Sequence, residues 1–185
     1  MAVGSEPQND RSQETTAVVA QTGEQTQKLP PGMVLGPDGK PCRACSSKSA
    51  FSSFVKGVTK PTPAAAVAPT IPDDCPPDVE ALGRSSWTLL HSIAATYPEQ
   101  PTRNQQNDLL GFVHLFAKLY PCWTCAEDFQ GYVAKSQPEV ESRGKFGMWL
   151  CGAHNDVNRK LGKKEFDCSM WEERWRTGWK DGRCD

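Results

Sequence analysis

The sequence predicts an all-α protein, a four-helix bundle plus a short fifth helix, with a disordered N-terminal tail. Three observations predict this fold class. From residue 74 onward the apolar residues recur at helical spacing. The same stretch has no alternating β-branched run and no G-x-G-x-x-G motif. All six tryptophans fall between Trp87 and Trp179, so the material for a core is concentrated there.

The first two helices are predicted from their terminators and their apolar spacing. Pro76 and Pro77 precede the first helix, which stops before Pro98. Its apolar positions are Val79, Leu82, Leu89, Leu90, Ile93 and Tyr97. Thr102 and Gln105 make a capping box that starts the second helix. Its inward positions are Leu109, Leu110, Val113, Phe116, Ala117 and Tyr120.

Two further helices follow Pro121, which interrupts the chain. The third is predicted over about 122–134. Ser142 caps the fourth and Gly162 stops it. The inward positions of the fourth are Phe146, Trp149, Leu150, Val157 and Leu161.

A short fifth helix completes the predicted domain. Ser169 and Glu172 have the spacing of a capping box, and the helix is expected to end near Trp179. The helices together make one folded domain at residues 74–185. A domain of roughly 110 residues buries only a small core, so disulfides or a tightly bound cofactor would help to stabilise it.

Residues 1–73 have a different composition. They contain no Trp or Tyr and only two Phe, and are rich in Pro, Gly, Ser, Thr, Gln and Ala. Such a segment buries too little apolar surface to offset its ordering entropy, so it is predicted to be disordered. Residues 60–72, with four prolines, are expected to form an extended linker. The one distinctive island is K-P-C-R-A-C, which carries Cys42 and Cys45.

Charge and hydropathy exclude several classes of function. The net charge of −1 provides no basic field for nucleic acid or an anionic membrane. No run of 18 apolar residues predicts a membrane span. The first 30 residues lack the apolar core of a secretory signal and hold only Arg11 and Lys28 as basic residues, so we expect neither a secretory signal nor a matrix presequence.

Eight cysteines carry the chemistry, and C-W-T-C at 122–125 is the main motif. Two thiols at i and i+3 at the start of a helix share one face and can form a disulfide. The helix N-terminus stabilises a thiolate there, as thiol exchange requires. A structural disulfide or half of a zinc site would show the same spacing. A thioredoxin fold would need a βαβ context, which is missing.

The remaining cysteines leave the rival interpretations open. Cys42 and Cys45 lie far outside the spacing of a compact zinc module with Cys122 and Cys125, which disfavours a zinc-binding adaptor. Cys151 and Cys168 could join the fourth helix to the fifth, which would stabilise by roughly 3 kcal/mol. A disulfide-stapled interaction module without turnover is the other alternative to a redox relay.

Two polar-aromatic stripes leave room for a flat ligand. Arg84, Trp87 and His91 share one side of the first helix. The second stripe, on the fourth helix, consists of Cys151, His154, Asn155 and Asn158. Each histidine taken alone would more often be an ordinary core or surface residue. Together with Lys160, Lys163 and Trp175, the stripes could stack an aromatic ring and neutralise a pyrophosphate.

Residues 74–185 resemble the Erv/ALR family of FAD-linked sulfhydryl oxidases, and the tail C-R-A-C resembles the shuttle dithiol of its long mitochondrial forms. The matching motifs are C-P-P-D-V-E-A-L-G-R-S-S-W-T-L-L-H-S at 75–92, Y-P-C-W-T-C at 120–125, W-L-C-G-A-H-N-D-V-N-R-K-L-G-K at 149–163 and W-E-E-R-W-R-T-G-W-K-D-G at 171–182. The resemblance implies a helical homodimer with non-covalently bound FAD in the mitochondrial intermembrane space.

The resemblance also implies residue roles. Cys122 and Cys125 would be the flavin-proximal pair, with Cys125 against the flavin and Cys122 exposed for exchange. Residues implied to line the FAD are Leu82, Gly83, Arg84, Trp87, His91, Tyr120, Cys151, His154, Asn155, Val157, Asn158, Lys160, Lys163, Arg174 and Trp175. Cys151 and Cys168 match the family's structural disulfide. Cys75 and Cys184 match a pair that links two subunits in some members, and two free thiols are the alternative.

The implied reaction is a thiol relay. A substrate dithiol would reduce Cys42–Cys45, which would reduce Cys122–Cys125, and FAD would pass the electrons to oxygen, giving hydrogen peroxide, or to cytochrome c. By resemblance the substrate is an import receptor of the mitochondrial disulfide relay. The sequence leaves the preferred acceptor and the role of residues 1–38 undecided. About 30 residues separate Cys45 from Cys75, and a flexible linker of that length reaches roughly 30 Å. That reach allows the shuttle dithiol to serve the Cys122–Cys125 pair of its own chain or of the partner subunit. The resemblance favours the partner subunit.

Overall fold

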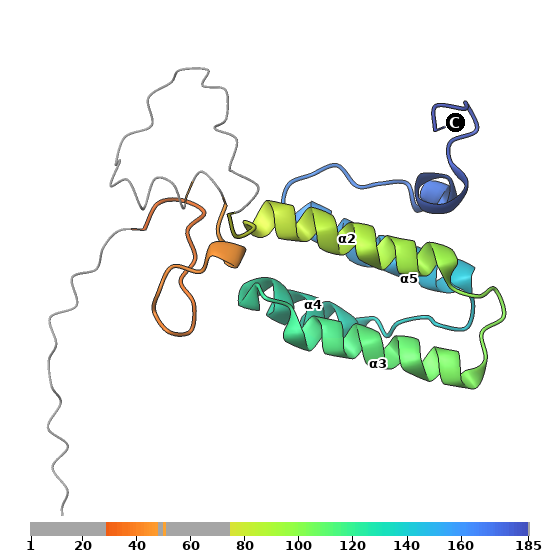
Figure 1. Cartoon of the computed structure of the whole chain (residues 1–185), viewed down its shortest axis with the longest axis horizontal. Coiled ribbons are helices and arrows are strands. Elements are labelled where there is room, and N and C mark those ends of the chain that lie inside the picture. The colour runs from red at the N-terminus through yellow and green to blue at the C-terminus, as the bar shows by residue number, and fades with distance from the viewer. Residues whose placement is uncertain (1–28, 48–49, 51–74, 185) are drawn as a thin grey trace, which may run out of the picture.

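The computed structural model describes residues 29–47, 50 and 75–184. Four α-helices form the bundle: α2 (Val79–Thr96), α3 (Arg103–Leu119), α4 (Trp123–Lys135) and α5 (Arg143–Lys160). Short helical segments lie at either side: the 3₁₀ helices η1 (Arg43–Cys45) and η2 (Cys168–Met170), and the π-helix η3 (Glu173–Thr177). α2 packs on α5 and α3 on α4 (Figure 1). The described residues contain no strand, which confirms the predicted all-α class.

The helix ends lie where the local signals placed them. The Asp78 side chain accepts a hydrogen bond from the backbone N–H of Ala81 at 2.8 Å at the start of α2. The capping box of Thr102 and Gln105 is present at the start of α3. Ser142 caps α5, and Gly162, just beyond it, has a φ of 67°. A positive φ strains any residue with a Cβ, which explains why a glycine stands at this stop.

The predicted start of the fifth helix is wrong. Asp167, not Ser169, is the N-cap, and its carboxylate accepts hydrogen bonds from the Ser169 backbone N–H at 3.0 Å and hydroxyl at 2.8 Å. The Ser169 hydroxyl is therefore used as a donor to Asp167 and makes no box with Glu172. The helical stretch runs to Thr177, and Gly178, with a φ of 79°, ends it.

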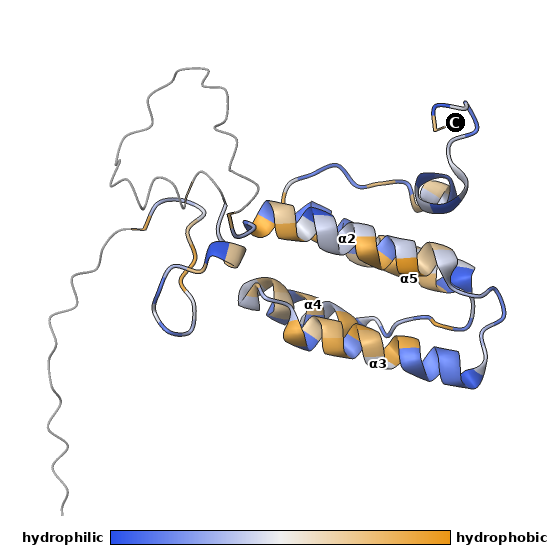
Figure 2. Ribbon diagram, viewed as in Figure 1, coloured by the Kyte–Doolittle hydropathy of each residue, from blue (hydrophilic) through white to orange (hydrophobic). Residues whose placement is uncertain are grey.

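The core fills the space between the four helices. Its buried members are Leu90, Ala94, Tyr97, Leu109, Val113, Ala117, Phe129, Val133, Val140, Phe146, Trp149, Leu150 and Ala153. The polar atoms of its aromatic residues are satisfied: Tyr97 donates to the carbonyl of Val140 at 3.0 Å and Trp149 to that of Ser136 at 3.0 Å. The hydropathy of α3 changes from hydrophilic at its start to hydrophobic further along (Figure 2).

The structure differs from the predicted disordered tail at residues 29–47, which we call the docked segment. Its chain forms a small hairpin, with a β-bridge between Leu35 and Pro41 and a hydrogen bond from the Cys42 N–H to the Val34 carbonyl at 2.9 Å. η1 contacts both α2 and α4 at one end of the bundle (Figure 1). Burial of Met33, Cys45 and Ser46, together with these backbone bonds, explains its order.

Other expectations for the N-terminal region lie outside the described residues. These are the linker at 60–72, the boundary between 73 and 74, and any role of residues 1–28. No helix among the described residues combines the length and apolar character needed to cross a membrane.

Candidate active site

The C-W-T-C motif forms a disulfide at the first turn of α4. Cys122 and Cys125 are bonded, with Cα atoms 5.3 Å apart. Cys122 is the N-cap residue, and its Sγ accepts a hydrogen bond from the backbone N–H of Cys125 at 3.4 Å. The other N–H groups of this turn and the helix dipole stabilise negative charge there. Reduction would therefore leave a thiolate at a position that favours it.

The exposure of the two sulfurs differs from the expectation. Cys122, implied by the family resemblance to be open to exchange, is 0% exposed, whereas Cys125 is partly buried. The docked segment lies against this helix start, where the Trp123 Nε1–H donates to the Leu35 carbonyl at 2.9 Å. The docked segment, which the sequence predicted to be disordered, therefore lies beside the residue next to the buried Cys122.

The second dithiol lies at the same end of the bundle. Cys42 and Cys45 form a disulfide around η1, the element that contacts both α2 and α4. Cys42 is partly buried and Cys45 is 7% exposed. The two redox-capable disulfides are therefore on neighbouring elements of one chain, although 77 positions separate Cys45 from Cys122 in the sequence.

Four aromatic rings from three elements meet further along α2. The Trp87 ring stacks on His154 of α5, with centroids 4.0 Å apart and planes 4° from parallel. The His91 ring stacks on Trp175 of η3 at 4.5 Å and 6°. The two pairs are joined by a contact of 3.1 Å between His91 Nε2 and His154 Nδ1. The structure therefore brings together Trp87 and His91 of the first predicted stripe with His154 of the second, and we call these three residues and Trp175 the ring cluster.

Both histidines of the ring cluster are neutral at physiological pH. Burial, then the charges of His154 and Arg174, lower the pKa of His91 to about 3. Burial, then Lys163 and Arg174, lower the pKa of His154 to about 4. His91 is 1% exposed, and its Nδ1 makes no hydrogen bond to any described residue. An unpartnered buried nitrogen is costly, so this atom is available to a bound ligand.

The chemistry of the ring cluster fits a flavin nucleotide. The two stacked pairs are already in contact, with centroids 4.0 and 4.5 Å apart, so a flat heterocycle would stack on an outer ring face of the cluster. The guanidinium of Arg174 lies 4.2 Å from the Trp175 ring centroid, and Arg174 and Lys163 both act on the histidines electrostatically. These cations suit the anionic pyrophosphate of such a ligand.

Two of the predicted ligand residues on α5 have structural partners instead. Asn155 is 8% exposed and pairs with the backbone of Phe166: its Nδ2 donates to the carbonyl and its Oδ1 accepts from the N–H, both at 2.8 Å. Asn158 donates to Asn155 Oδ1 at 3.4 Å. Both ends of the Asn155 amide are thus occupied in fixing the loop after α5.

Lys160 also lies apart from the ring cluster. Its Nζ is 2.6 Å from both Asp128 of α4 and Asp156. Hydrogen bonds to these two carboxylates raise the pKa of Lys160. The three residues belong to a hollow of about 230 Å³ between α4 and α5, whose lining contains none of the four rings. The structure therefore gives Lys160 a salt-bridge role.

The predicted residues at the start of α2 are not gathered on the rings. Arg84 is exposed, and its guanidinium Nη1 lies 4.0 Å from the carboxylate Oε2 of Glu80. Burial raises the pKa of Tyr120, which is hydrogen-bonded to Ser86. The remaining predicted residues, Leu82, Gly83 and Val157, are partly buried.

The last four cysteines fall into two groups. Cys151 of α5 is bonded to Cys168 of η2, with Cα atoms 5.8 Å apart. Cys75 and Cys184 are exposed and carry no disulfide within the described part of the chain.

The structure also bears on the zinc interpretation. Cys42, Cys45, Cys122 and Cys125 are paired in disulfides, a state that offers no thiolate ligands. Within the described ranges, no group of three or more His, Cys, Asp or Glu side chains is placed to hold a metal ion.

Sequence reasoning missed two residues that shape the dithiol end of the bundle. Trp123 stands inside the C-W-T-C motif, whose spacing concerns only the two cysteines, and no motif marks Ser46. Ser46 is 0% exposed, although it lies in a polar stretch. The tryptophan inside C-W-T-C is the one sequence feature that indicated a further contact there. The sequence does not identify the acceptor of its indole N–H.

Comparisons with known proteins point to one family. A family model described as the Erv1 / Alr family matches residues 84–176. The mitochondrial FAD-linked sulfhydryl oxidase ERV1 of Saccharomyces cerevisiae is 42% identical over 167 residues, covering 80% of this chain and 88% of that protein. The mitochondrial FAD-linked sulfhydryl oxidase erv1 of Schizosaccharomyces pombe is 38% identical over 164 residues, covering 77% of this chain and 90% of that protein.

Solved structures give the same result. The crystal structure of the yeast Erv1 core has a TM-score of 0.58 and 52% sequence identity, and covers 63% of this chain and 98% of that one. The FAD binding domain of Erv1 from Saccharomyces cerevisiae has a TM-score of 0.55 and 54% identity, and covers 57% of this chain and all (100%) of that one.

Proposed function

Because this chain belongs to the Erv1/Alr family and is an FAD-linked sulfhydryl oxidase, we propose that it makes disulfides in proteins through two internal dithiols. Electrons would pass from a substrate dithiol to Cys42–Cys45, then to Cys122–Cys125, and then to FAD. The observation that carries this order is the contact of η1, which bears the first disulfide, with α4, which bears the second.

FAD is the cofactor, and the ring cluster is the part of the described chain that supports a place for it. Trp87, His91, His154 and Trp175 would hold the flat ring, His91 Nδ1 would gain a polar partner, and Lys163 with Arg174 would face the phosphates. When bound, FAD supplies the two-electron acceptor for the dithiol and passes the electrons to oxygen, giving hydrogen peroxide, or to cytochrome c.

The cysteines perform two successive thiol–disulfide exchanges. A substrate thiolate attacks Cys42, the more exposed sulfur of its pair, and the Cys45 thiolate leaves. The second substrate thiol then displaces Cys42, which yields oxidised substrate and two chain thiols. The same exchange next reduces Cys122–Cys125 and restores the Cys42–Cys45 disulfide. Cys122 is attacked first, and the N-terminus of α4 stabilises the thiolate that forms at Cys125.

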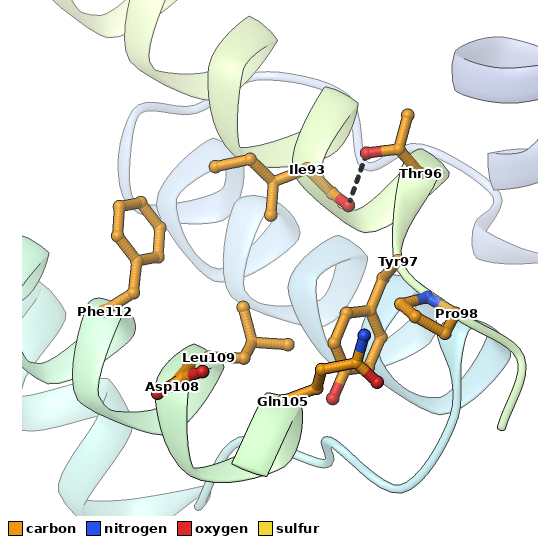
Figure 3. Close-up of a pocket in the computed structure, with 8 residues that line it drawn as sticks. All are labelled: Ile93, Thr96, Tyr97, Pro98, Gln105, Asp108, Leu109 and Phe112. Atoms are coloured by element: carbon orange, nitrogen blue, oxygen red, sulfur yellow. Dashed lines mark hydrogen bonds between the residues drawn. The ribbon is translucent and has the colours of Figure 1, made fainter. Parts of the chain in front are cut away.

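A homodimer is part of this proposal. Three leucines on the outer faces of α2 and α3 are exposed, namely Leu89 at 53%, Leu115 at 58% and Leu119 at 72%. A groove of about 340 Å³ lies between the same two helices (Figure 3), lined by Ile93, Thr96, Tyr97, Pro98, Gln105, Asp108, Leu109 and Phe112. Apolar surface of this kind supports association of two copies. The exposed Cys75 and Cys184 would link one subunit to the other.

The location and the substrate class are also proposals. The relatives are named mitochondrial, and a chain that makes disulfides suits an oxidising compartment. We place it in the mitochondrial intermembrane space, where an import receptor of the disulfide relay would be its thiol substrate.

Oxygen uptake with dithiothreitol (DTT) as the thiol tests the function. The FAD-loaded full chain should consume oxygen and release hydrogen peroxide, and Cys125→Ser should lose nearly all of this turnover while keeping its bound flavin. Ser92→Ala, at an exposed position of α2, is the control. Undiminished turnover in Cys125→Ser would contradict the proposal.

A further inference from the structure

Given the proposed function, we infer that Trp123 determines which thiols reach the Cys122–Cys125 disulfide. Its indole N–H holds the docked segment over Cys122, so the oxidised pair meets the chain's own Cys42–Cys45 dithiol before it meets small thiols from solvent. Trp123 is thus a specificity-determining residue placed between the two cysteines of the motif.

The burial of Cys122 is the first observation. A helix N-cap that follows a proline in a loop is ordinarily exposed, yet Cys122 is 0% exposed. The neighbouring Trp123 makes the one side-chain hydrogen bond described between α4 and the docked segment, from Nε1 to the Leu35 carbonyl at 2.9 Å. A nucleophile must reach a sulfur along the S–S axis, so a covered Cys122 is closed to a thiol in solution.

The shape of the docked segment is the second observation. The Ser46 hydroxyl accepts from the Val34 N–H at 3.0 Å and donates to the Cys42 carbonyl at 2.8 Å. These two bonds connect the hairpin to the loop that carries the Cys42–Cys45 pair. The same hairpin carries the Leu35 carbonyl, which accepts from Trp123. Both groups reach α4 together, which couples the position of the shuttle disulfide to the Trp123 contact.

Among the described residues, individual hydrogen bonds join the docked segment to the rest of the chain, so the docking can open. Besides the indole bond, the Arg43 Nε donates to the Pro76 carbonyl at 3.0 Å, and the Val79 N–H donates to the Ser46 carbonyl at 3.4 Å. Loss of a single hydrogen bond changes such an equilibrium by about five-fold. Removing the indole donor should therefore raise the undocked population by about that factor.

The test uses the FAD-loaded full chain under anaerobic conditions, with the phosphine TCEP as a small reductant. TCEP is oxidised to its phosphine oxide and leaves two thiols per disulfide. Two quantities together count the electrons delivered to Cys122–Cys125. One is the amount of thiol at these cysteines, labelled with maleimide and assigned by peptide mass spectrometry, and the other is the amount of flavin bleached. Trp123→Phe keeps the ring and removes the donor, and it should raise this rate by about five-fold.

Two further variants separate docking from general damage. Trp179→Phe makes the same chemical change at a partly buried tryptophan that stacks with Arg183 outside the docked segment, and it should leave the rate unchanged. Ser46→Ala removes the hydroxyl that holds the hairpin of the docked segment, which weakens the docking from the segment's side. It should therefore also raise the rate at which TCEP reduces Cys122–Cys125. Since the Ser46 side chain acts by holding the hairpin that carries the acceptor of Trp123, its loss should matter less once the indole donor is gone. The double variant should therefore fall short of the product of the two single effects.

Hydrogen–deuterium exchange supplies a readout independent of the flavin. In Trp123→Phe and in Ser46→Ala, the amides of residues 33–46 should exchange faster, while those of α3 stay protected. An unchanged TCEP rate in both variants would overturn the inference, as would a faster rate with full protection at 33–46. A wild-type chain whose flavin never bleaches would overturn the relay alone, because the labelling and exchange results do not depend on it.

Discussion

At the scale of single residues, the ring cluster concentrates the unusual physical chemistry of the chain. The buried His91 and the partly buried His154 are joined by a contact between their ring nitrogens, and each stacks on one tryptophan. The cost of desolvating an imidazolium there keeps both rings uncharged. Neutral rings can stack on a flavin and exchange hydrogen bonds with it without adding charge to the site.

The depressed histidine pKa values predict an acid-sensitive fold. The pKa of His91 falls from 6.5 to about 3, and that of His154 from 6.5 to about 4. The unfolded chain therefore binds more protons than the folded chain below pH 6.5, so the free energy of unfolding decreases as pH falls from 6.5 toward 4. Urea midpoints of the FAD-free chain, measured from pH 7 to 5, should fall steadily.

The control for this prediction is the third histidine. His114 is exposed on α3, and His114→Gln should keep the same pH profile, whereas His91→Gln should flatten it. Equal slopes in all three proteins would show that these histidines do not set the acid sensitivity.

Gly147 provides a second test at this scale. A Cβ there would lie 2.5 Å from the ring of Trp171, which is itself 4% exposed. Gly147→Ala should destabilise the fold by about 1–3 kcal/mol despite the better helix propensity of alanine. Gly144→Ala, with only Ser142 Oγ at 3.9 Å, should be neutral or slightly stabilising. Thermal unfolding of both would decide, and equal stability of the two would contradict the packing.

The sequence predicted some of these residues better than others. Trp87 and His91 could be placed on one stripe and His154 on another in advance, because helical spacing puts each stripe on one face of its helix. The partners of Asn155 and Lys160 could not, because Phe166 lies in a loop and Asp128 on another helix. Whether the side chain of Asn155 or Lys160 binds a ligand or a neighbouring residue depends on distances in the folded chain. The spacing of residues along the sequence does not give those distances.

At the scale of elements, the connection between α5 and η3 positions Trp175 for the ring cluster. The Cys151–Cys168 disulfide and the Asn155–Phe166 pair both fix the chain between them. Closing a loop of this size stabilises by about 3 kcal/mol in the chain-entropy model. The double variant Cys151→Ser with Cys168→Ser should therefore lose about that much stability, read as a lower denaturant midpoint.

A single exposed thiol is the control for the disulfide. Cys75→Ser removes a cysteine without a disulfide in the described chain and should leave the midpoint unchanged. If the double variant matched it, the Asn155 amide alone would be sufficient to hold the loop.

Helix boundaries were predictable from the sequence because their signals are local. The capping box of Thr102 and the glycine at 162 act on the nearest turn, and both work as expected. The start of the fifth helix was not, because Asp167 accepts hydrogen bonds from the backbone N–H and the hydroxyl of Ser169 and so caps the chain two residues earlier. The docked segment was missed for a different reason: its order comes from contacts with α2 and α4, not from its own composition.

At the scale of the whole molecule, one chain carries the two disulfides and the ring cluster that the proposed relay would use. Cys45→Ser should slow oxidation of a reduced protein substrate by a large factor while slowing DTT oxidation far less, because DTT can reduce Cys122–Cys125 directly once the docked segment moves. Parallel oxygen-uptake assays with the two thiols measure this ratio. An equal loss on both would remove the shuttle role from Cys42 and Cys45.

Delivery of electrons from chain thiols to a bound flavin can be seen directly in the visible absorption spectrum of the purified full chain, recorded before and after anaerobic DTT and again after readmission of air. The spectrum should show a flavin band that DTT bleaches and air restores. A chain that stays colourless after refolding with FAD, or a flavin band that DTT leaves unchanged, would contradict it.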